Sequence, residues 1–172
     1  NPGLSSATVR SLHLMLHNAL NRAVKERLIL RNPTEDCIAP KVQKFEMQIL
    51  QPEHIKTYLD AADKRGLLPM FYLELSSGLR RGELLALQWE DLNVKERILT
   101  VNKQVYEVNG KLRLSVPKTK ASIRKLLLPP GVVEVLREYR NRVNSRWLFP
   151  SPVKADRPIT PGVARRRLQT IL

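Results

Sequence analysis

The sequence predicts an α+β fold that is mainly helical and carries a small three-stranded antiparallel sheet. Apolar residues recur at helical spacing toward both ends of the chain, whereas the middle is rich in alternating and β-branched residues. In this middle part Asn109-Gly110 separates two such runs, which is the strongest short signal for a hairpin. Prolines and glycines mark the limits of the segments.

The first helix is expected over residues 6–30, because an apolar stripe at helical spacing continues until Asn32-Pro33 stops it. Residues 32–48 have no period and are expected to form a linker. A proline and an acidic residue at 52–53 favour the start of the next helix. Further helices are expected at 52–63, 67–77, 80–88 and 131–144, and from 161 onward, with the last helix still running at Leu172.

Three strands are expected between these helices. Residues 98–108 and 111–116 flank the Asn109-Gly110 turn and should pair as a hairpin. Residues 124–128 can add a third strand, which Pro129-Pro130 would end. The predicted antiparallel sheet therefore consists of these three runs.

Positive charge is the strongest global feature of the chain, which has 172 residues and a formal net charge of +14. Residues 1–44 carry +4, residues 45–110 carry −2, and residues 111–172 carry fifteen basic against three acidic side chains, or +12. This asymmetry favours an electropositive face for a polyanion, and double-stranded DNA is the expected partner. A solvated charged surface is the plainer alternative.

The most informative segment is Ser77 to Asp91, called the arginine box below. In it a glycine turn leads into a short helix, with Arg80 at the turn and Glu83 in the first turn of the helix. An arginine fixed in this way can hold a phosphate through two parallel hydrogen bonds. Composition alone favours a plainer role for Arg80, that of a surface arginine paired with Glu83.

The pattern Gly-Leu-Arg-x-x-Glu-Leu-x-x-Leu-x-Trp-x-Asp closely resembles the box around the first catalytic arginine of the tyrosine recombinases, the integrases of phages, transposons and other bacterial mobile elements. The resemblance runs from about Leu50 to Leu172 and implies part of the DNA breaking-rejoining catalytic fold. It also implies a reaction without metal or cofactor, in which a tyrosine forms a 3′-phosphotyrosyl link that a 5′-hydroxyl later displaces. Arg80 is then expected to be catalytic, and Glu83 to orient Arg80 or to hold the turn.

A lysine is the second expected catalytic residue. Pro117-Lys118-Thr119 resembles the hairpin of these integrases in which the lysine acts as a general acid toward the leaving 5′-oxygen. An alkoxide leaving group requires a proton, so this chemistry suits a lysine. Lys120 is the competing candidate, and a solvent-exposed turn lysine is the alternative without function.

Other cations are expected to contact phosphates, which would position DNA without reading its sequence. For each arginine of the later helices, a solvated face is an equally good interpretation. The candidates are Arg81, Lys120, Arg124, Arg137, Arg140, Arg165 and Arg166.

The resemblance implies two domains. Residues 1–44 would hold the last helix of the helical DNA-gripping domain with its linker, and residues 45–172 the first part of the catalytic domain. The family's His-x-x-Arg box and nucleophilic tyrosine are expected further along a longer parent protein, so no nucleophile is assigned in this chain. The chain itself is expected to bind DNA weakly as a monomer and to cleave nothing, whereas the parent would act as a tetramer on paired sites.

Composition bounds the remaining possibilities. The only cysteine, Cys37, cannot form a disulfide within the chain, which fits a reducing cytoplasm. His13 and His17 have a spacing that can suit a metal, but no third ligand accompanies them, so no metal site is expected. Neither an apolar run of membrane-spanning length nor a secretory signal is apparent, and no membrane partner is expected.

Two other functions compete with a recombinase. A non-catalytic DNA-binding module could have kept the same fold, and it would show the same basic segment. A helical protein that binds an acidic protein partner is the third possibility. The third differs from the others in its prediction that binding to DNA has no steep salt dependence.

Overall fold

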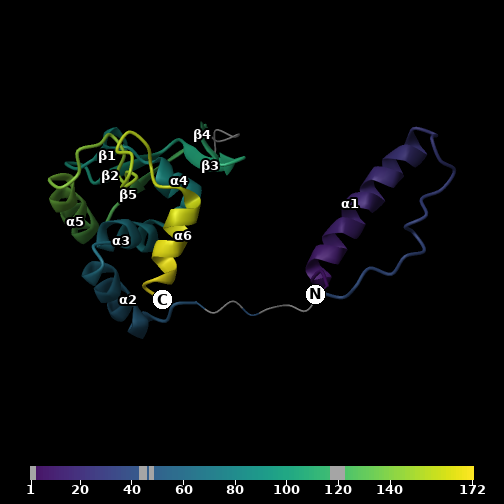
Figure 1. Ribbon diagram of the computed structural model, residues 1–172, viewed down its shortest axis with the longest axis horizontal. Coiled ribbons are helices and arrows are strands. Elements are labelled where there is room, and N and C mark those ends of the chain that lie inside the picture. The colour runs from purple at the N-terminus through teal and green to yellow at the C-terminus, as the bar shows by residue number, and fades with distance from the viewer. Residues whose placement is uncertain (1–2, 43–45, 47–48, 117–122) are drawn as a thin grey trace. The chain divides into compact units, whose positions relative to one another are not determined.

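The computed structural model describes residues 3–42, 46, 49–116 and 123–172. The chain divides into two compact units, Asn1–Ile49 and Leu50–Leu172. Each unit is described by itself. Figure 1 labels the helices and strands, and the second unit contains all of them except α1.

The helix described in the first unit is α1 (Ser6–Lys25), which is shorter than the predicted 6–30. Ser5 caps its start by accepting a hydrogen bond from the backbone N–H of Thr8, at 3.2 Å. The helix ends early because Arg27 adopts a left-handed conformation, with φ 59°. The N–H of Arg27 then bonds to the carbonyl of Val24, and that of Leu28 to Ala23. This pair of bonds is a Schellman motif, which closes a helix by satisfying its last carbonyls.

A polar cluster holds the chain after α1 against the helix. The Asn32 amide donates to the carbonyl of His17 at 3.1 Å and to Oδ1 of Asn21 at 2.8 Å. Its own Oδ1 accepts from both the N–H and the hydroxyl of Thr34. Asn32 and Thr34 are buried, whereas α1 itself has no buried residue.

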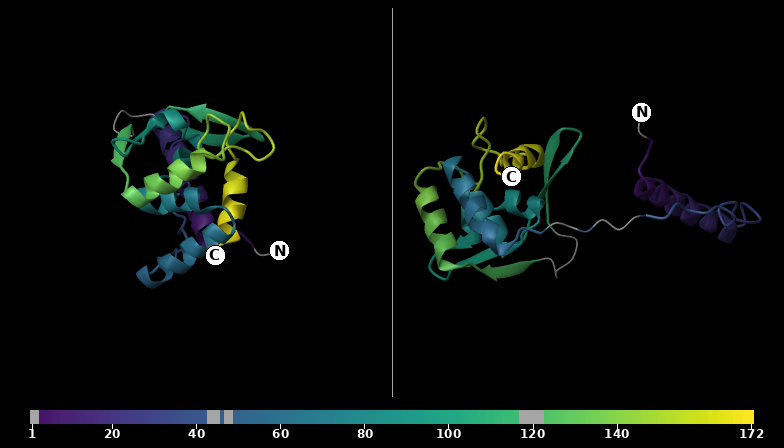
Figure 2. Two further views of the ribbon diagram at one scale, coloured as in Figure 1. Left: turned by 90° about the vertical axis from the view of Figure 1, so that its left-hand side faces the viewer. Right: turned by 90° about the horizontal axis from the view of Figure 1, so that it is seen from below.

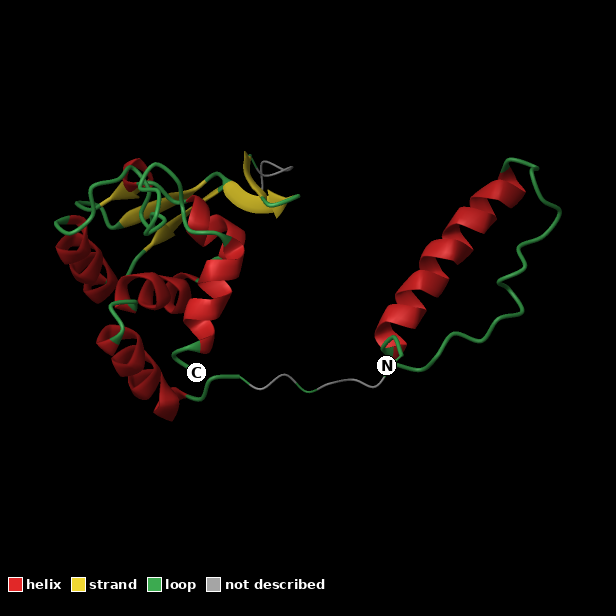
Figure 3. Ribbon diagram, viewed as in Figure 1, coloured by secondary structure: helices red, strands yellow, loops and turns green. Residues whose placement is uncertain are grey.

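The second unit begins with α2 (Pro52–Lys64) and α3 (Leu68–Ser77), close to their predicted positions. The predicted helix 80–88 is in fact a shorter helix, α4 (Arg81–Ala86), followed by a single 3-10 turn, η1 (Trp89–Asp91). The helix α5 (Pro130–Arg140) follows the strands, and α6 (Pro161–Gln169) ends before Leu172, contrary to the prediction. Figure 3 shows the strands of this unit on one side and α2 and α3 on the other.

The three-stranded sheet exists, but its strands differ from the predicted set. It contains β1 (Leu92–Asn93), β2 (Ile98–Val101) and β5 (Arg124–Leu127), with β2 in the middle and both pairings antiparallel. The register places Val101 opposite Arg124 and Ile98 opposite Leu127. The predicted run 98–108 is therefore two strands, because the chain leaves the sheet after Val101.

The Asn109-Gly110 hairpin forms a separate two-stranded sheet. Its strands are β3 (Gln104–Val108) and β4 (Lys111–Ser115), and both turn residues have positive φ, as a tight hairpin turn requires. The right-hand view of Figure 2 shows this hairpin standing apart from the three-stranded sheet. Only Val105 in it is buried, so the hairpin contributes little to the core.

The core of the second unit combines both kinds of element. Its fully buried side chains come from helices, strands and the segment after α5, and they include Leu73, Leu84, Leu99, Leu136, Leu148 and Ile159. Residues 146–148 run antiparallel to residues 87–89, and the N–H of Leu148 bonds to the carbonyl of Leu87 at 3.0 Å. This pairing fixes the end of the arginine box against the core.

Candidate functional site: the arginine box and its basic surroundings

Arg80 lies at the junction between α3 and α4. Helix α3 ends at Gly78, whose left-handed φ of 60° turns the chain at low cost because glycine lacks a Cβ. Leu79 then enters the core, and Arg80 takes an extended conformation as the residue that precedes α4. A buried residue therefore fixes the backbone immediately before Arg80, while its side chain is 78% exposed.

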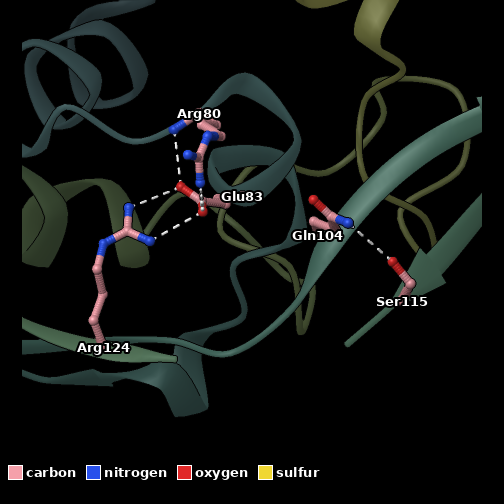
Figure 4. Close-up of polar contacts among 5 residues, drawn as sticks. All are labelled: Arg80, Glu83, Gln104, Ser115 and Arg124. Carbon is pink, nitrogen blue, oxygen red and sulfur yellow. Dashed lines mark hydrogen bonds and ion pairs between the residues drawn. The ribbon is translucent and has the colours of Figure 1, made fainter. Parts of the chain in front are cut away.

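Glu83 is the centre of a charged network under Arg80 (Figure 4). Its carboxylate is 3% exposed, and Oε2 accepts the backbone N–H of Arg80 at 2.9 Å. Arg124 donates to both oxygens, through Nη1 at 3.0 Å and Nη2 at 2.9 Å. The Arg80 guanidinium makes a longer contact to Oε1, 3.4 Å. The strong bonds of Glu83 thus go to the Arg80 backbone and to Arg124, which leaves the exposed Arg80 side chain accessible to a ligand.

The same network favours the ionised form of Glu83. Its hydrogen bonds from Arg124 lower the pKa of the carboxyl group, and the backbone N–H of Arg80 acts in the same direction, against the opposing effect of burial. Glu83 was expected to orient Arg80 or to hold the turn, and its contacts have the geometry for both. Arg124 was expected to contact phosphate, and in the structure its guanidinium donates to both oxygens of Glu83.

Gly82 allows the hairpin to approach α4 closely. A Cβ at this position would lie 2.7 Å from the carbonyl oxygen of Val105 in β3, closer than such atoms can stand. The preceding residue of β3, Gln104, donates to the hydroxyl of Ser115 across the hairpin at 3.3 Å (Figure 4). The arginine box is therefore in direct contact with β3 at Gly82.

The other end of the arginine box contains an ion pair that sequence reasoning missed. Asp91 is 4% exposed and lies 3.1 Å from Nζ of Lys103, which is 15% exposed. Asp91 also accepts the backbone N–H of Gln88 at 2.7 Å. Lys103 further contacts Glu90 and the side chain of Gln88, each at 3.2 Å. The box pattern includes the aspartate, but its partner lies beyond β2 and no local spacing indicates it.

The remaining predicted cations are in different environments. Arg81 is exposed and lies near Glu74. Burial raises the pKa of Glu74, and the positive charge of Arg81 partly offsets this increase. Arg137 pairs with Glu134 at 2.7 Å on the surface of α5. The guanidinium of Arg140 lies 4.6 Å from the ring centre of Trp89, a cation–π contact.

Arg165 and Arg166 are exposed on α6, and neither belongs to an ion pair among the described residues. Lys118 and Lys120 lie outside the described residues. The structure therefore brings together Arg80, Glu83 and Arg124. The predicted arginines of α5 and α6 do not belong to this network.

A basic groove of about 880 Å³ lies between the β3–β4 hairpin and residues 146–160. Its apolar lining includes Val105, Leu112 and Pro158. The cations that line it are Lys111, Arg113, Arg146, Lys154 and Arg157, with Asp156 as the acidic residue in the lining. Most of these cations were not singled out in the sequence, because they become neighbours only when the hairpin and the later loop meet.

The four tyrosines of the chain lie in different environments. Burial, with a smaller contribution from Glu74, raises the pKa of Tyr58 to about 12. Burial also raises the pKa of Tyr139, which packs between Trp89 and Phe149. Tyr106 is exposed on the hairpin, and Tyr72 is half-buried against the core.

The histidines also have ordinary surroundings. The rings of His13 and His17 stack with their centres 6.0 Å apart, and His17 Nδ1 lies 2.8 Å from the hydroxyl of Thr34. Within the described ranges, no three His, Cys, Asp or Glu side chains cluster as a metal site would require. Nor does any helix described here have the length and apolar character needed to cross a membrane.

The fold defined by these elements is that of integrase catalytic domains. An integrase of the Tn1549 transposon, solved in complex with a circular intermediate DNA, superposes with a TM-score of 0.84 at 20% identity, over 97% of this chain and 59% of that one. A lambda integrase dimer bound to a COC′ core site gives a TM-score of 0.66 at 18% identity, over 96% and 46%. The expected α+β recombinase fold is thereby confirmed.

The family follows from the sequence comparison. Residues 48–172 match the model of the phage integrase family, so the chain belongs to that family. A XerC-like tyrosine recombinase of Caldanaerobacter subterraneus subsp. tengcongensis is 33% identical over 158 residues, 81% of this chain and 40% of the relative. The ICEBs1 integrase of Bacillus subtilis is 29% identical, over 80% of this chain and 38% of the relative. The chain thus spans less than half the length of these two relatives.

Proposed function

We propose that the chain is part of a site-specific recombinase that cleaves and rejoins DNA through a 3′-phosphotyrosyl intermediate. The observation that carries the proposal is the exposed Arg80 guanidinium, whose backbone is fixed by buried Glu83 inside the segment that matches the integrase family. Such an arginine can bind the nonbridging oxygens of a phosphate, where charge increases in the transition state.

The proposed reaction needs no metal. A tyrosine oxygen forms a bond to the phosphorus while the bond from phosphorus to the 5′-oxygen breaks, and Lys118 gives the leaving oxygen its proton. Arg80 stabilises the charge on the phosphate. We assign the second arginine, the histidine and the tyrosine of the family to parts of the protein outside this chain.

We infer that double-stranded DNA is the partner and that charged surfaces away from Arg80 help to hold it. The net charge of +12 in residues 111–172 and the cations of the basic groove support this inference, because phosphate neutralisation dominates nonspecific DNA affinity. Arg81, Arg137, Arg140, Arg165 and Arg166 stay candidates for phosphate contacts.

We also propose that the parent protein acts as a tetramer on DNA in the cytoplasm. A lambda integrase tetramer bound to a Holliday junction shares the fold of this chain, with a TM-score of 0.67 at 18% identity, and this likeness motivates the proposed assembly. The absence of a cysteine pair in the sequence fits a reducing compartment.

We further propose that the chain of 172 residues binds DNA as a monomer but does not cleave it. The pKa values raised by burial in Tyr58 and Tyr139 oppose the phenolate that an attack on phosphorus requires. A covalent adduct formed between this chain alone and DNA would contradict that proposal.

The test uses the complete protein encoded by the reading frame. Nicked duplexes tiled over the DNA that flanks the frame are incubated with it, since a nick lets the cleaved strand leave and the covalent adduct accumulate. We expect an adduct in the presence of EDTA, and a decrease of about a hundredfold or more in its rate of formation for Arg80→Ala. DNA binding without any adduct would favour the alternative, a DNA-binding module that kept the recombinase fold.

A further inference from the structure

The carboxylate of Glu83 is shared by two arginines that differ in what else they can reach. Arg80 makes one long side-chain contact to it, 3.4 Å, and is 78% exposed. Arg124 makes two short ones, 2.9 and 3.0 Å, and is 32% exposed. A guanidinium with two parallel bonds to a buried carboxylate already uses the fork that phosphate recognition would need.

Glu83 depends on this partner for its position. At 3% exposure its charge is removed from water, and a buried carboxylate that lacks a cation either becomes protonated or moves toward solvent. Either change would disturb the bond between its Oε2 and the backbone N–H of Arg80. That N–H stands at the start of α4, where the helix itself provides no acceptor.

Arg124 also links two distant parts of the chain. It begins β5, opposite Val101 of β2, whereas Glu83 lies in α4. Along the chain, Ile123 and then the segment that contains Lys118 precede it directly. The pair with Glu83 therefore fixes the start of β5 against the arginine box.

We propose that Arg124 is a positioning residue for Arg80, acting through Glu83, and that it does not bind DNA phosphate. The inference rests on the proposed recombinase function. It assigns Arg124 a role different from the one the sequence suggested, since its basic character and its closeness to Lys118 in the sequence favoured a phosphate contact.

The experiment compares Arg124→Gln with Lys125→Gln in the complete protein. Lys125 is the next residue of β5, is exposed, and loses the same charge on substitution. The probe is whichever nicked duplex gives an adduct with the unaltered protein. With Arg124→Gln we expect the single-turnover rate at saturating protein to fall about tenfold or more, while DNA affinity and its salt dependence match those of Lys125→Gln. Reduced affinity with an unchanged saturating rate would overturn the proposal.

A double-mutant cycle tests whether the effect passes through Arg80. Arg80→Lys keeps a cation but loses the planar guanidinium fork. The orientation that Glu83 gives to residue 80 then matters less for binding of the phosphate. We expect Arg124→Gln to lower the rate by a smaller factor in the Arg80→Lys background than in the unaltered protein. An equal factor in both backgrounds would mean that Arg124 acts independently of Arg80, which overturns the proposal.

Two further outcomes are separated by the same set of proteins. If the unaltered protein forms no adduct with any tiled duplex, the recombinase function fails, and the positioning role fails with it. If it forms an adduct that Arg80→Lys impairs, but Arg124→Gln behaves as Lys125→Gln, only the positioning role fails. Should Arg124→Gln not fold, Arg124→Lys is decisive, and a folded Arg124→Lys with the full rate would overturn the proposal.

Discussion

The arginine box and the α5–α6 region of the second unit use charge in opposite ways. In and around the box, Glu83 and Asp91 are buried, and each is paired with a cation from a distant part of the chain. On α5 the pair between Arg137 and Glu134 is local and more than half exposed. The difference teaches that the buried ion pairs of the box fix the positions of backbone and side chains. The exposed charges of the later helices mainly contribute to the electrostatic potential at the surface.

The largest expected effect on stability comes from breaking a buried pair of the box. Lys103→Met leaves the buried Asp91 carboxylate without its ammonium partner, and we expect the free energy of unfolding to fall by about 3 kcal/mol. Urea unfolding followed by tryptophan fluorescence measures this unit alone, because Trp89 and Trp147 both belong to it.

The matched control is Arg137→Met, which breaks the exposed pair on α5. We expect a change within about 0.5 kcal/mol, since surface ion pairs contribute little. Equal decreases in the two variants would remove the distinction between the regions.

The contrast between the regions also explains what the sequence could predict. Helix positions and the place of Arg80 follow from local signals: apolar spacing, Gly78 and the box pattern. The partner of Glu83 does not follow from local signals, because Arg124 is brought beside Glu83 by the pairing of β5 with β2. A basic residue near a candidate catalytic lysine looks the same in sequence whether it faces a phosphate or a buried carboxylate.

The sheet was mispredicted for the same reason. Residues 98–108 look like one strand, since β-branched residues continue through the run. In the structure the chain leaves the three-stranded sheet after Val101, and Gln104 begins a second sheet beside α4. Strand pairing is decided by contacts between distant segments, which a single sequence does not display. The end of α1 was missed because it depends on Arg27, a non-glycine residue in the left-handed region.

A smaller effect is expected from the packing of α4 against β3. Gly82→Ala would place a methyl group 2.7 Å from the Val105 carbonyl oxygen, so the hairpin must move, and we expect a decrease of about 1–3 kcal/mol in the free energy of unfolding. On α6, Gly162→Ala meets only ordinary contacts at 3.8 and 3.9 Å. There we expect an increase of up to about 1 kcal/mol, because alanine favours the helix. The same urea titration compares the two, and a stable Gly82→Ala would show that the close approach is not required.

The pH dependence of stability should also differ between the buried Glu83 of the box and the exposed Glu134 of α5. The hydrogen bonds from Arg124 lower the pKa of Glu83, so the folded state binds fewer protons at this site than the unfolded state, where a glutamate titrates near about 4.3. The stabilisation is therefore present above that value and is lost as pH falls through the lowered pKa. We expect the unaltered protein to lose more stability in acid than Glu83→Gln. Glu134→Gln, which removes a carboxylate from the exposed pair, should keep the acid sensitivity because it retains Glu83.

The smallest effect on folding is expected on α6, where the effect on DNA should be the clearest. The double substitution Arg165→Gln with Arg166→Gln removes two exposed cations and should leave the unfolding free energy within about 0.5 kcal/mol. If both side chains neutralise phosphates, the slope of log affinity against log salt for a short duplex of arbitrary sequence becomes shallower by about 0.9 for each phosphate that is no longer neutralised.

The control for α6 is the pair Lys64→Gln with Arg65→Gln, two exposed neighbouring cations at the end of α2, in the part of the chain with nearly balanced charge. We expect it to leave the salt slope unchanged, because a field directed at DNA depends on where the cations lie and not on their number. A shallow slope in the unaltered chain would favour an acidic protein partner in place of DNA. Equal slopes for the two double variants would instead mean that α6 lies away from the DNA, which would confine the electropositive face to the groove between the hairpin and residues 146–160.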